Sequence, residues 1–218
     1  MEENSMADAD PVALQPEKGR RTRARRQAPL VRRQDLLAVT VNCLARLGPR
    51  GTTGREICRQ AGVSHGLLRH YFINPDNLLL ETYEQLCEQL LAHVEAEVIP
   101  YEADPWDALH RFFVAVFSKE WAGPDIIGAW MVFWQLVRSR EDFQLVSERF
   151  NLRQRALMDR IAQRLPGERD AGQLADAIAI LSAILDGLWI EFYLSEARTP
   201  AERCIALCER AARMLFAA

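Results

Sequence analysis

Histidine and long apolar runs are scarce in this chain of 218 residues. The 4 histidines leave little material for a metal site, and 5 cysteines, an odd number, predict reduced thiols rather than a disulfide framework. No window approaches about 18 uncharged apolar residues, and acids followed by bases precede any apolar stretch at the N-terminus. We therefore expect a cytoplasmic protein with no membrane span, no secretory signal, no metal and no cofactor.

Strict alternation of polar and apolar residues is also scarce, which argues against strands. Apolar residues instead recur at spacings of three and four through most of the chain after residue 30, as amphipathic helices require. Asn74-Pro75 and Asp104-Pro105 place a polar cap before a proline at the first helical position. The sequence predicts an all-α fold of about nine helices, near residues 31–47, 53–61, 64–72, 75–97, 105–120, 124–138, 141–165, 169–196 and 200–217.

The charge is unevenly divided along the chain. Residues 18–72 carry thirteen Lys or Arg against two acids, whereas residues 73–218 carry fourteen bases against twenty-three acids. A basic segment joined to an acidic remainder predicts a module that binds a polyanion, with nucleic acid as the first candidate, on a body with another task.

Residues 53–72, TGREICRQAGVSHGLLRHYF, have the pattern of a helix-turn-helix. Thr53 and Glu56 form a T-x-x-E capping box, and Gly62 supplies a residue that can take a positive φ in the turn. Ser64 then caps the second short helix. On a helical wheel Leu68 and Phe72 share the inner side of that helix.

The opposite side of the second helix is predicted to enter the major groove of DNA. Gly66 would allow close approach of the backbone, Leu67 would touch a thymine methyl, and Arg69 or His65 would donate to guanine or phosphate. The helix N-termini at Thr53 and Ser64 present N–H groups suited to phosphate oxygens. The full set of predicted DNA contacts in this region is Thr53, Ser64, His65, Gly66, Leu67, Arg69, His70 and Tyr71.

A basic arm precedes the first predicted helix. Arg23, Arg25 and Arg26 belong to a run of bases that starts at Lys18 and that would follow the DNA backbone or reach a minor groove. The other interpretation, a solvated disordered tail without a DNA contact, stays open for this arm.

The pattern TTxxEIxxxAGVSxGxLxHYFxxxxxLL from Thr52 to Leu79 resembles the TetR family of transcriptional regulators. Further similarity, in Gly66 with His70-Tyr71-Phe72, in Ala129-Trp130 to Phe133-Trp134 and in Leu185-Asp186-Gly187-Leu188-Trp189, is to the BetI-type branch, the choline-responsive repressors of glycine betaine synthesis. The resemblance implies a homodimer with a three-helix DNA-binding domain and a C-terminal domain for ligand binding and dimerisation. It divides the chain into a tail over 1–29, a DNA-binding domain over 30–90 and a C-terminal domain over 91–218.

Two positions depart from that family pattern. Many members have Tyr where this chain has Arg69 and Lys where it has Pro75, and both of those residues usually contact phosphate. Arg69 would keep such a contact, whereas Pro75 removes a charge. The operator sequence and affinity of relatives therefore do not transfer to this chain.

Two aromatic faces mark the C-terminal portion, which holds all five tryptophans. Trp130, Phe133 and Trp134 follow i, i+3, i+4 spacing, and Trp189, Phe192 and Tyr193 repeat it. Faces of this kind would form an aromatic cage for a quaternary ammonium, assisted by Asp125, Asp186 or Glu191. They would equally form an ordinary core or a dimer contact, so both interpretations stay open. The predicted ligand contacts are Trp130, Phe133, Trp134, Asp186, Trp189 and Tyr193.

The sequence favours a repressor released from a palindromic operator by a small molecule such as choline. An enzyme is disfavoured because no nucleophile-base pair, paired metal-ligand motif or phosphate-binding glycine loop is visible. The alternative is a helical adaptor that binds acidic membranes or other polyanions through its basic N-terminal segment, which liposome sedimentation would detect.

Overall fold

The computed structural model describes residues 29–194 and 199–216, and these residues form nine α-helices and no strand, which confirms the predicted all-α class. Pro29, with which the first helix begins, is the one residue of the predicted tail that falls inside the described part. The elements are α1 (Pro29–Gly51), α2 (Gly54–Ala61), α3 (His65–Tyr71), α4 (Pro75–Val98), the 3-10 turn η1 (Ile99–Tyr101), α5 (Pro105–Val116), α6 (Pro124–Val137), α7 (Glu141–Ala162), α8 (Ala171–Leu194) and α9 (Ala201–Phe216).

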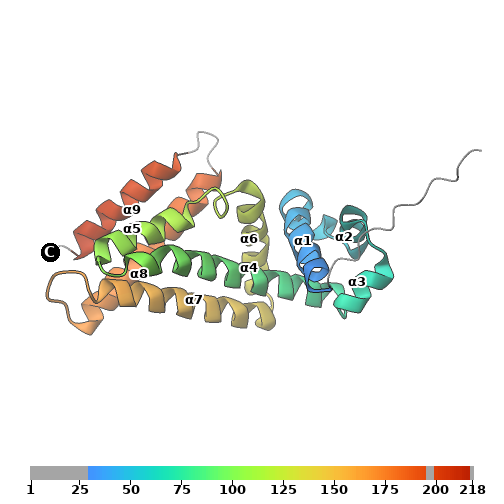
Figure 1. Cartoon of the computed structure of the whole chain (residues 1–218), viewed down its shortest axis with the longest axis horizontal. Coiled ribbons are helices and arrows are strands. Elements are labelled where there is room, and N and C mark those ends of the chain that lie inside the picture. Colours follow the sequence, from blue (N-terminus) through green and yellow to red (C-terminus); the bar gives the residue numbers. More distant parts are fainter. Residues whose placement is uncertain (1–28, 195–198, 217–218) are drawn as a thin grey trace, which may run out of the picture.

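The molecule is elongated, with the three N-terminal helices α1, α2 and α3 at one end (Figure 1). Helix α4 runs from that end into the larger part, and α7 runs parallel beside it. Helix α6 crosses this pair and packs on α1, while α5, α8 and α9 lie at the far end (Figure 1). Helices α4 and α6 therefore connect the two ends of the molecule.

Local signals explain most of the helix boundaries. The side chain of Asn74 accepts a hydrogen bond from the Asn77 N–H at the start of α4, and Asp104 accepts from Trp106 and Asp107 at the start of α5. Gly48 has φ 65° and breaks the helical path of α1 at the predicted position. Helix α5 ends four residues earlier than predicted, because the chain turns at Phe117 and buries both Phe117 and Trp121.

Two separate cores hold the fold. A small core joins α1, α2 and α3 to the first turns of α4 through Leu36, Ile57, Leu68, Phe72 and Leu78. The larger core fills the rest of the described chain and also takes in Leu44 of α1; its first buried residue on α4 is Tyr83. Helices α1 and α4 thus belong to both cores. The predicted domain boundary at residue 90 lies within α4, and the division remains a prediction.

All five cysteines are buried. Burial raises the pKa of each thiol, and for Cys87 and Cys208 it raises the pKa to about 12. The thiols are therefore protonated at neutral pH and serve as small apolar core groups.

Helix α8 is apolar but mostly uncovered in the single chain. By length and composition alone, Ala171–Phe192 is long and apolar enough to cross a membrane, which the sequence interpretation did not anticipate. Ile180 and Leu194 on α8 and Met214 on α9 are 49%, 67% and 75% exposed.

Candidate DNA-reading helix and ligand cavity

The turn of the helix-turn-helix is built as its sequence predicts. Thr53 accepts a hydrogen bond from the Glu56 N–H at 3.2 Å, and Ser64 accepts from the Leu67 N–H at 3.2 Å. Gly62 takes the left-handed conformation, with φ 63° and ψ 35°, and its N–H is bonded to the Cys58 carbonyl. These three residues set the angle at which α3 leaves α2.

The predicted capping box is only half formed. The Glu56 carboxylate turns to Arg59 and Gln60, at 2.5–2.9 Å, instead of reaching back to the Thr53 N–H. These hydrogen bonds, that from Arg59 above all, lower the pKa of Glu56 to about 2. A guanidinium within one turn of the helix is therefore a stronger partner for this carboxylate than the backbone N–H.

Helix α3 presents one basic face to solvent. His65, Gly66, Arg69 and His70 are exposed, whereas Leu68 is buried in the small core. Leu67 and Tyr71 are half-buried, and the Tyr71 ring packs edge-on against His70 at 5.4 Å between centroids. The helix contains no acid, so this face is suited to a polyanion.

The structure adds Arg55 to this face. A pocket of about 370 Å³ has among its lining residues Arg55 from α2, His65 and Arg69 from α3, and Ile73 from the following turn. Ile73 is 84% exposed, an unusual position for so apolar a side chain. Arg55 is an exposed base in the first turn of α2, a signal that the sequence interpretation passed over. Arg23, Arg25 and Arg26 lie outside the described residues.

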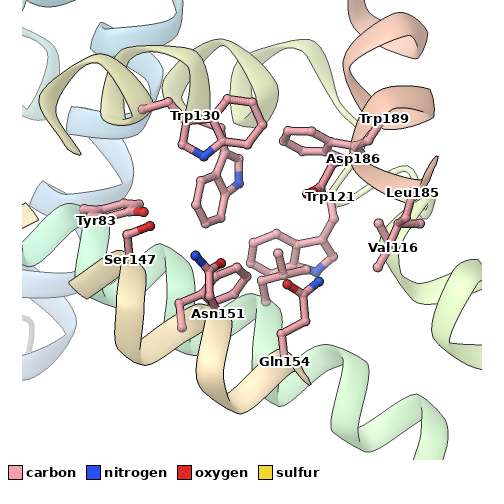
Figure 2. Close-up of a pocket in the computed structure, with 13 residues that line it drawn as sticks. Tyr83, Val116, Trp121, Trp130, Ser147, Asn151, Gln154, Leu185, Asp186 and Trp189 are labelled. Atoms are coloured by element: carbon pink, nitrogen blue, oxygen red, sulfur yellow. The ribbon is translucent and has the colours of Figure 1, made fainter. Parts of the chain in front are cut away.

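A cavity of about 200 Å³ lies in the larger part of the molecule, among α4, α5, α6, α7 and α8 (Figure 2). Four of its walls are indole rings. Its lining consists of Tyr83, Leu90, Val116, Trp121, Trp130, Trp134, Ser147, Phe150, Asn151, Gln154, Leu185, Asp186 and Trp189. The predicted residues Trp130, Trp134, Asp186 and Trp189 are thus brought together around one space.

Other predicted ligand contacts lie elsewhere. Phe133 is fully buried and stacks on Tyr83, with centroids 4.8 Å apart, so it belongs to the core and does not line the cavity. Asp125 forms an ion pair with Arg46 of α1, at 3.3 Å, and Glu191 does not line the cavity. The side chain of Tyr193 lies outside the described part of the structure.

Asp186 is the only acid or base in the described lining of the cavity. The residue as a whole is exposed, yet its carboxyl points into the space between Trp121 and Trp189 (Figure 2). The surrounding protein atoms raise the pKa of Asp186 by desolvation. A bound cation would offset that cost.

The polar floor of the cavity was missed by the sequence interpretation. Ser147, Asn151 and Gln154 all come from α7 and direct their polar groups toward the aromatic rings (Figure 2). Their spacing of four and three residues puts them on one helical face, and that uncharged polar stripe was the available signal.

Several buried polar atoms at the cavity have no protein partner. Tyr83 Oη, Trp121 Nε1 and Trp130 Nε1 make no hydrogen bond, although the three side chains are at most 5% exposed. The Ser147 hydroxyl lies near that of Tyr83 (Figure 2), but the two do not meet in hydrogen-bonding geometry. Buried donors without partners are costly, so this arrangement favours a ligand or water that accepts from them.

An exposed basic helix in a helix-turn-helix, on a chain that also carries an aromatic cavity, defines the class of DNA-binding regulators. Residues 36–82 match the family model for bacterial regulatory proteins of the tetR family, and residues 105–217 match the model for the C-terminal part of BetI-type transcriptional repressors. The chain belongs to the TetR family of DNA-binding transcriptional regulators and to its BetI-type branch.

Curated relatives agree with this assignment. The HTH-type transcriptional regulator BetI of Vibrio campbellii is 27% identical over 180 residues, which are 80% of this chain and 87% of that protein. BetI of Agrobacterium fabrum is 28% identical over 167 residues, covering 77% of this chain and 79% of that protein.

Solved structures show the same architecture. A transcriptional regulator from Pseudomonas aeruginosa PAO1 has a TM-score of 0.77 and 30% identity, covering 90% of this chain and 95% of its own. A regulator from Saccharomonospora viridis, solved in complex with choline, has a TM-score of 0.71 at 17% identity, covering 82% and 93%, and shows the shared fold.

Proposed function

We propose that this chain is a cytoplasmic, homodimeric repressor that binds a palindromic operator and is released from it by a small organic cation, with choline as the first candidate, in the control of betaine metabolism. The observation that carries the proposal is the cavity, in which four indoles surround one carboxylate in the same chain as an exposed DNA-reading helix.

The chemistry of the cavity favours an ammonium ligand. Aromatic faces attract a cation that has left water, and a quaternary ammonium has no N–H groups that need partners. Asp186 supplies the opposite charge, and neither Lys nor Arg is among the described lining residues. The unpartnered Tyr83 hydroxyl would donate to the oxygen of choline. A structural neighbour of the same fold was solved with choline, which agrees with this choice.

The exposed face of α3 supports sequence reading. Arg69 and His65 would donate to bases or phosphates, and the N-termini of α2 and α3 at Thr53 and Ser64 would bind phosphate oxygens. A Cβ on Gly66 would meet no atom nearer than Ser64 Oγ at 3.8 Å. Packing within the chain therefore does not require this glycine, and close approach of DNA is the reason that we propose for it.

The uncovered surface of α8 and α9 supports dimerisation. Ile180, Leu194 and Met214 would be removed from water if the two helices of one subunit packed on the same pair of a second subunit. A dimer of this kind would place two copies of α3 on successive major grooves of a palindrome.

The test is selection of binding sites from random duplex DNA, followed by titration of the selected site with choline. We expect a palindrome, and release of the protein by choline. Arg69→Ala should weaken operator binding and leave dimerisation intact, and Tyr71→Phe tests the Tyr71 hydroxyl without removing the packed ring. Binding to acidic liposomes without a selected sequence would support the adaptor instead and would contradict the repressor.

A further inference from the structure

A stack of three aromatic rings leads from the cavity to the start of α7. Tyr83, which lines the cavity, lies parallel to Phe143 of α7, with ring centroids 5.8 Å apart and planes inclined by 19°. Phe133 of α6 is stacked against both rings, at 4.8 Å from Tyr83 and 6.2 Å from Phe143. All three side chains are completely buried, so a shift of one ring displaces the others.

Arg140 stands at the outer end of this stack. It is the N-cap residue of α7, and its guanidinium carbon lies 4.9 Å from the centre of the Phe143 ring. The guanidinium holds Asp142 with two hydrogen bonds of 2.7 and 3.1 Å, which fix its orientation. Its remaining nitrogen, Nη1, lies 3.2 Å from Oδ1 of Asp76.

Asp76 belongs to the first turn of α4, directly after the DNA-reading helix. Three residues separate it from Phe72, the buried residue that caps the end of α3. Phe72 and Leu78, which flank Asp76 in the chain, belong to the same small core as Leu68 of α3. A displacement of the start of α4 therefore moves α3 with it.

We propose that Arg140 is a positioning residue for the DNA-reading helix, which holds the start of α4 against the aromatic stack of the cavity and transmits ligand binding from Tyr83 to Asp76. The inference rests on the proposed function, because it needs a ligand cavity and an operator. The ligand acts on this contact in two ways, since Tyr83 lines the cavity and the polar floor of the cavity is carried by α7 itself. Helix α7 begins directly after Arg140, toward the end of the molecule that carries α1, α2 and α3 (Figure 1).

The ion pair between Arg140 and Asp76 is too exposed to contribute much to the stability of the fold. The side chains of Arg140 and Asp76 are 30% and 70% exposed, and pairs of this kind contribute little to stability. Variants at these two positions should therefore fold and bind choline as the wild type does. A loss of coupling between the cavity and the operator in these variants would then not be due to misfolding.

The distribution of tryptophan supplies a readout that needs no added ligand. All five tryptophans lie between residues 106 and 189, so fluorescence excited at the red edge of their absorption reports on the larger part of the molecule and not on α1, α2 or α3. Because coupling is reciprocal, operator binding to the wild-type protein should change this emission.

The experiment compares Asp76→Asn and Arg140→Gln with the wild-type chain, using the selected operator duplex and choline. Both variants should bind the operator, measured by anisotropy of a labelled duplex, and should lose the change in tryptophan emission. The ratio of operator affinities without and with choline, about 5- to 150-fold in coupled systems, should fall below about twofold. Choline affinity without DNA should stay within about twofold of the wild type.

Matched controls come from the same interface between α4 and α7. Glu84 pairs with Arg149 at 2.9 Å and Glu88 with Arg153 at 2.6 Å, and neither arginine makes the cation–π contact with the stack that Arg140 makes with Phe143. Glu84→Gln and Glu88→Gln should keep both the emission change and the choline ratio. Since Asp76→Asn also removes a charge from the start of a helix, Arg140→Gln, which keeps that charge, must show the same loss.

Three outcomes are distinct. If both variants keep the wild-type emission change and choline ratio, the inference is overturned and the proposed function stands. If the control variants lose the emission change and the choline ratio to the same extent, the ion pair of Arg140 with Asp76 does not transmit ligand binding specifically, and the inference is also overturned. If the wild-type chain selects no operator, the proposed function fails, and the inference fails with it.

Discussion

The indole ring of Trp189 meets that of Trp130 nearly edge-on, with ring centroids 6.3 Å apart and planes inclined by 83°. Trp189 lies on α8 and Trp130 on α6, so this contact joins the helix with the uncovered apolar surface to the helix that packs on α1. Both helices also form walls of the cavity. Helix α8 would contact a second subunit, and α6 connects the larger part of the molecule to the end that carries the helix-turn-helix.

Trp134 offers the mildest test of the aromatic cage, because it is only half-buried. We expect Trp134→Leu to weaken choline binding by about 2- to 30-fold, which corresponds to the loss of about 0.5–2 kcal/mol from one cation–π contact. Isothermal titration without DNA measures this. Trp106, outside the cavity beneath Arg213, is the control, and Trp106→Leu should bind choline as the wild type does. Equal losses in the two variants would mean that the effect is not specific to the cavity.

The raised pKa of Asp186 predicts a pH dependence of cation binding. A cation binds the ionised carboxylate, so choline affinity should be constant at high pH and should fall as the pH drops through the pKa of Asp186, which lies above the ordinary value of 3.8. Asp186→Asn should give weaker binding with no such fall. In the absence of ligand the same replacement should raise stability at neutral pH, because the ionised carboxylate is the disfavoured form in the folded chain. An identical pH profile in the variant would assign the effect to another group.

Two glycines of the helix-turn-helix should respond in opposite ways to alanine. Gly62→Ala forces a side chain into φ 63° and should cost about 1–2 kcal/mol in urea unfolding. Gly66→Ala lies within α3 with nothing nearer than 3.8 Å, so it should leave stability unchanged or raise it by up to about 1 kcal/mol. The Gly66 variant should nevertheless bind the operator more weakly. Full operator affinity in this variant would show that DNA does not approach the backbone at Gly66.

The exposed apolar surface of α8 predicts the oligomeric state. Ile180→Glu places a charge on this surface and should convert the dimer to a monomer in sedimentation analysis. Leu152 of α7 is 67% exposed and serves as the control, since Leu152→Glu should remain dimeric. A monomeric wild-type chain, or a dimeric Ile180 variant, would exclude this surface as the subunit contact.

The helix-turn-helix was predictable because its determinants lie close together in sequence. Thr53, Gly62 and Ser64 each act on atoms within about one helical turn, so spacing alone indicates their roles. The cavity is different, since its lining comes from five helices between Tyr83 and Trp189. Helical spacing places Phe133 and Trp134 on one face of α6 but does not tell which neighbouring helix each ring meets. The unanticipated polar stripe on α7 gains its meaning only from the tryptophans that face it.

The burial of all five cysteines has a practical consequence. With their pKa values raised and their sulfur atoms away from the surface, the native thiols should react slowly with maleimides and with peroxide. Alkylation of the wild-type chain therefore reports unfolding rather than surface chemistry. A single cysteine introduced on the exposed face of α3 would be the one rapidly reactive sulfhydryl among the described residues, so a probe could be placed there without first removing the others.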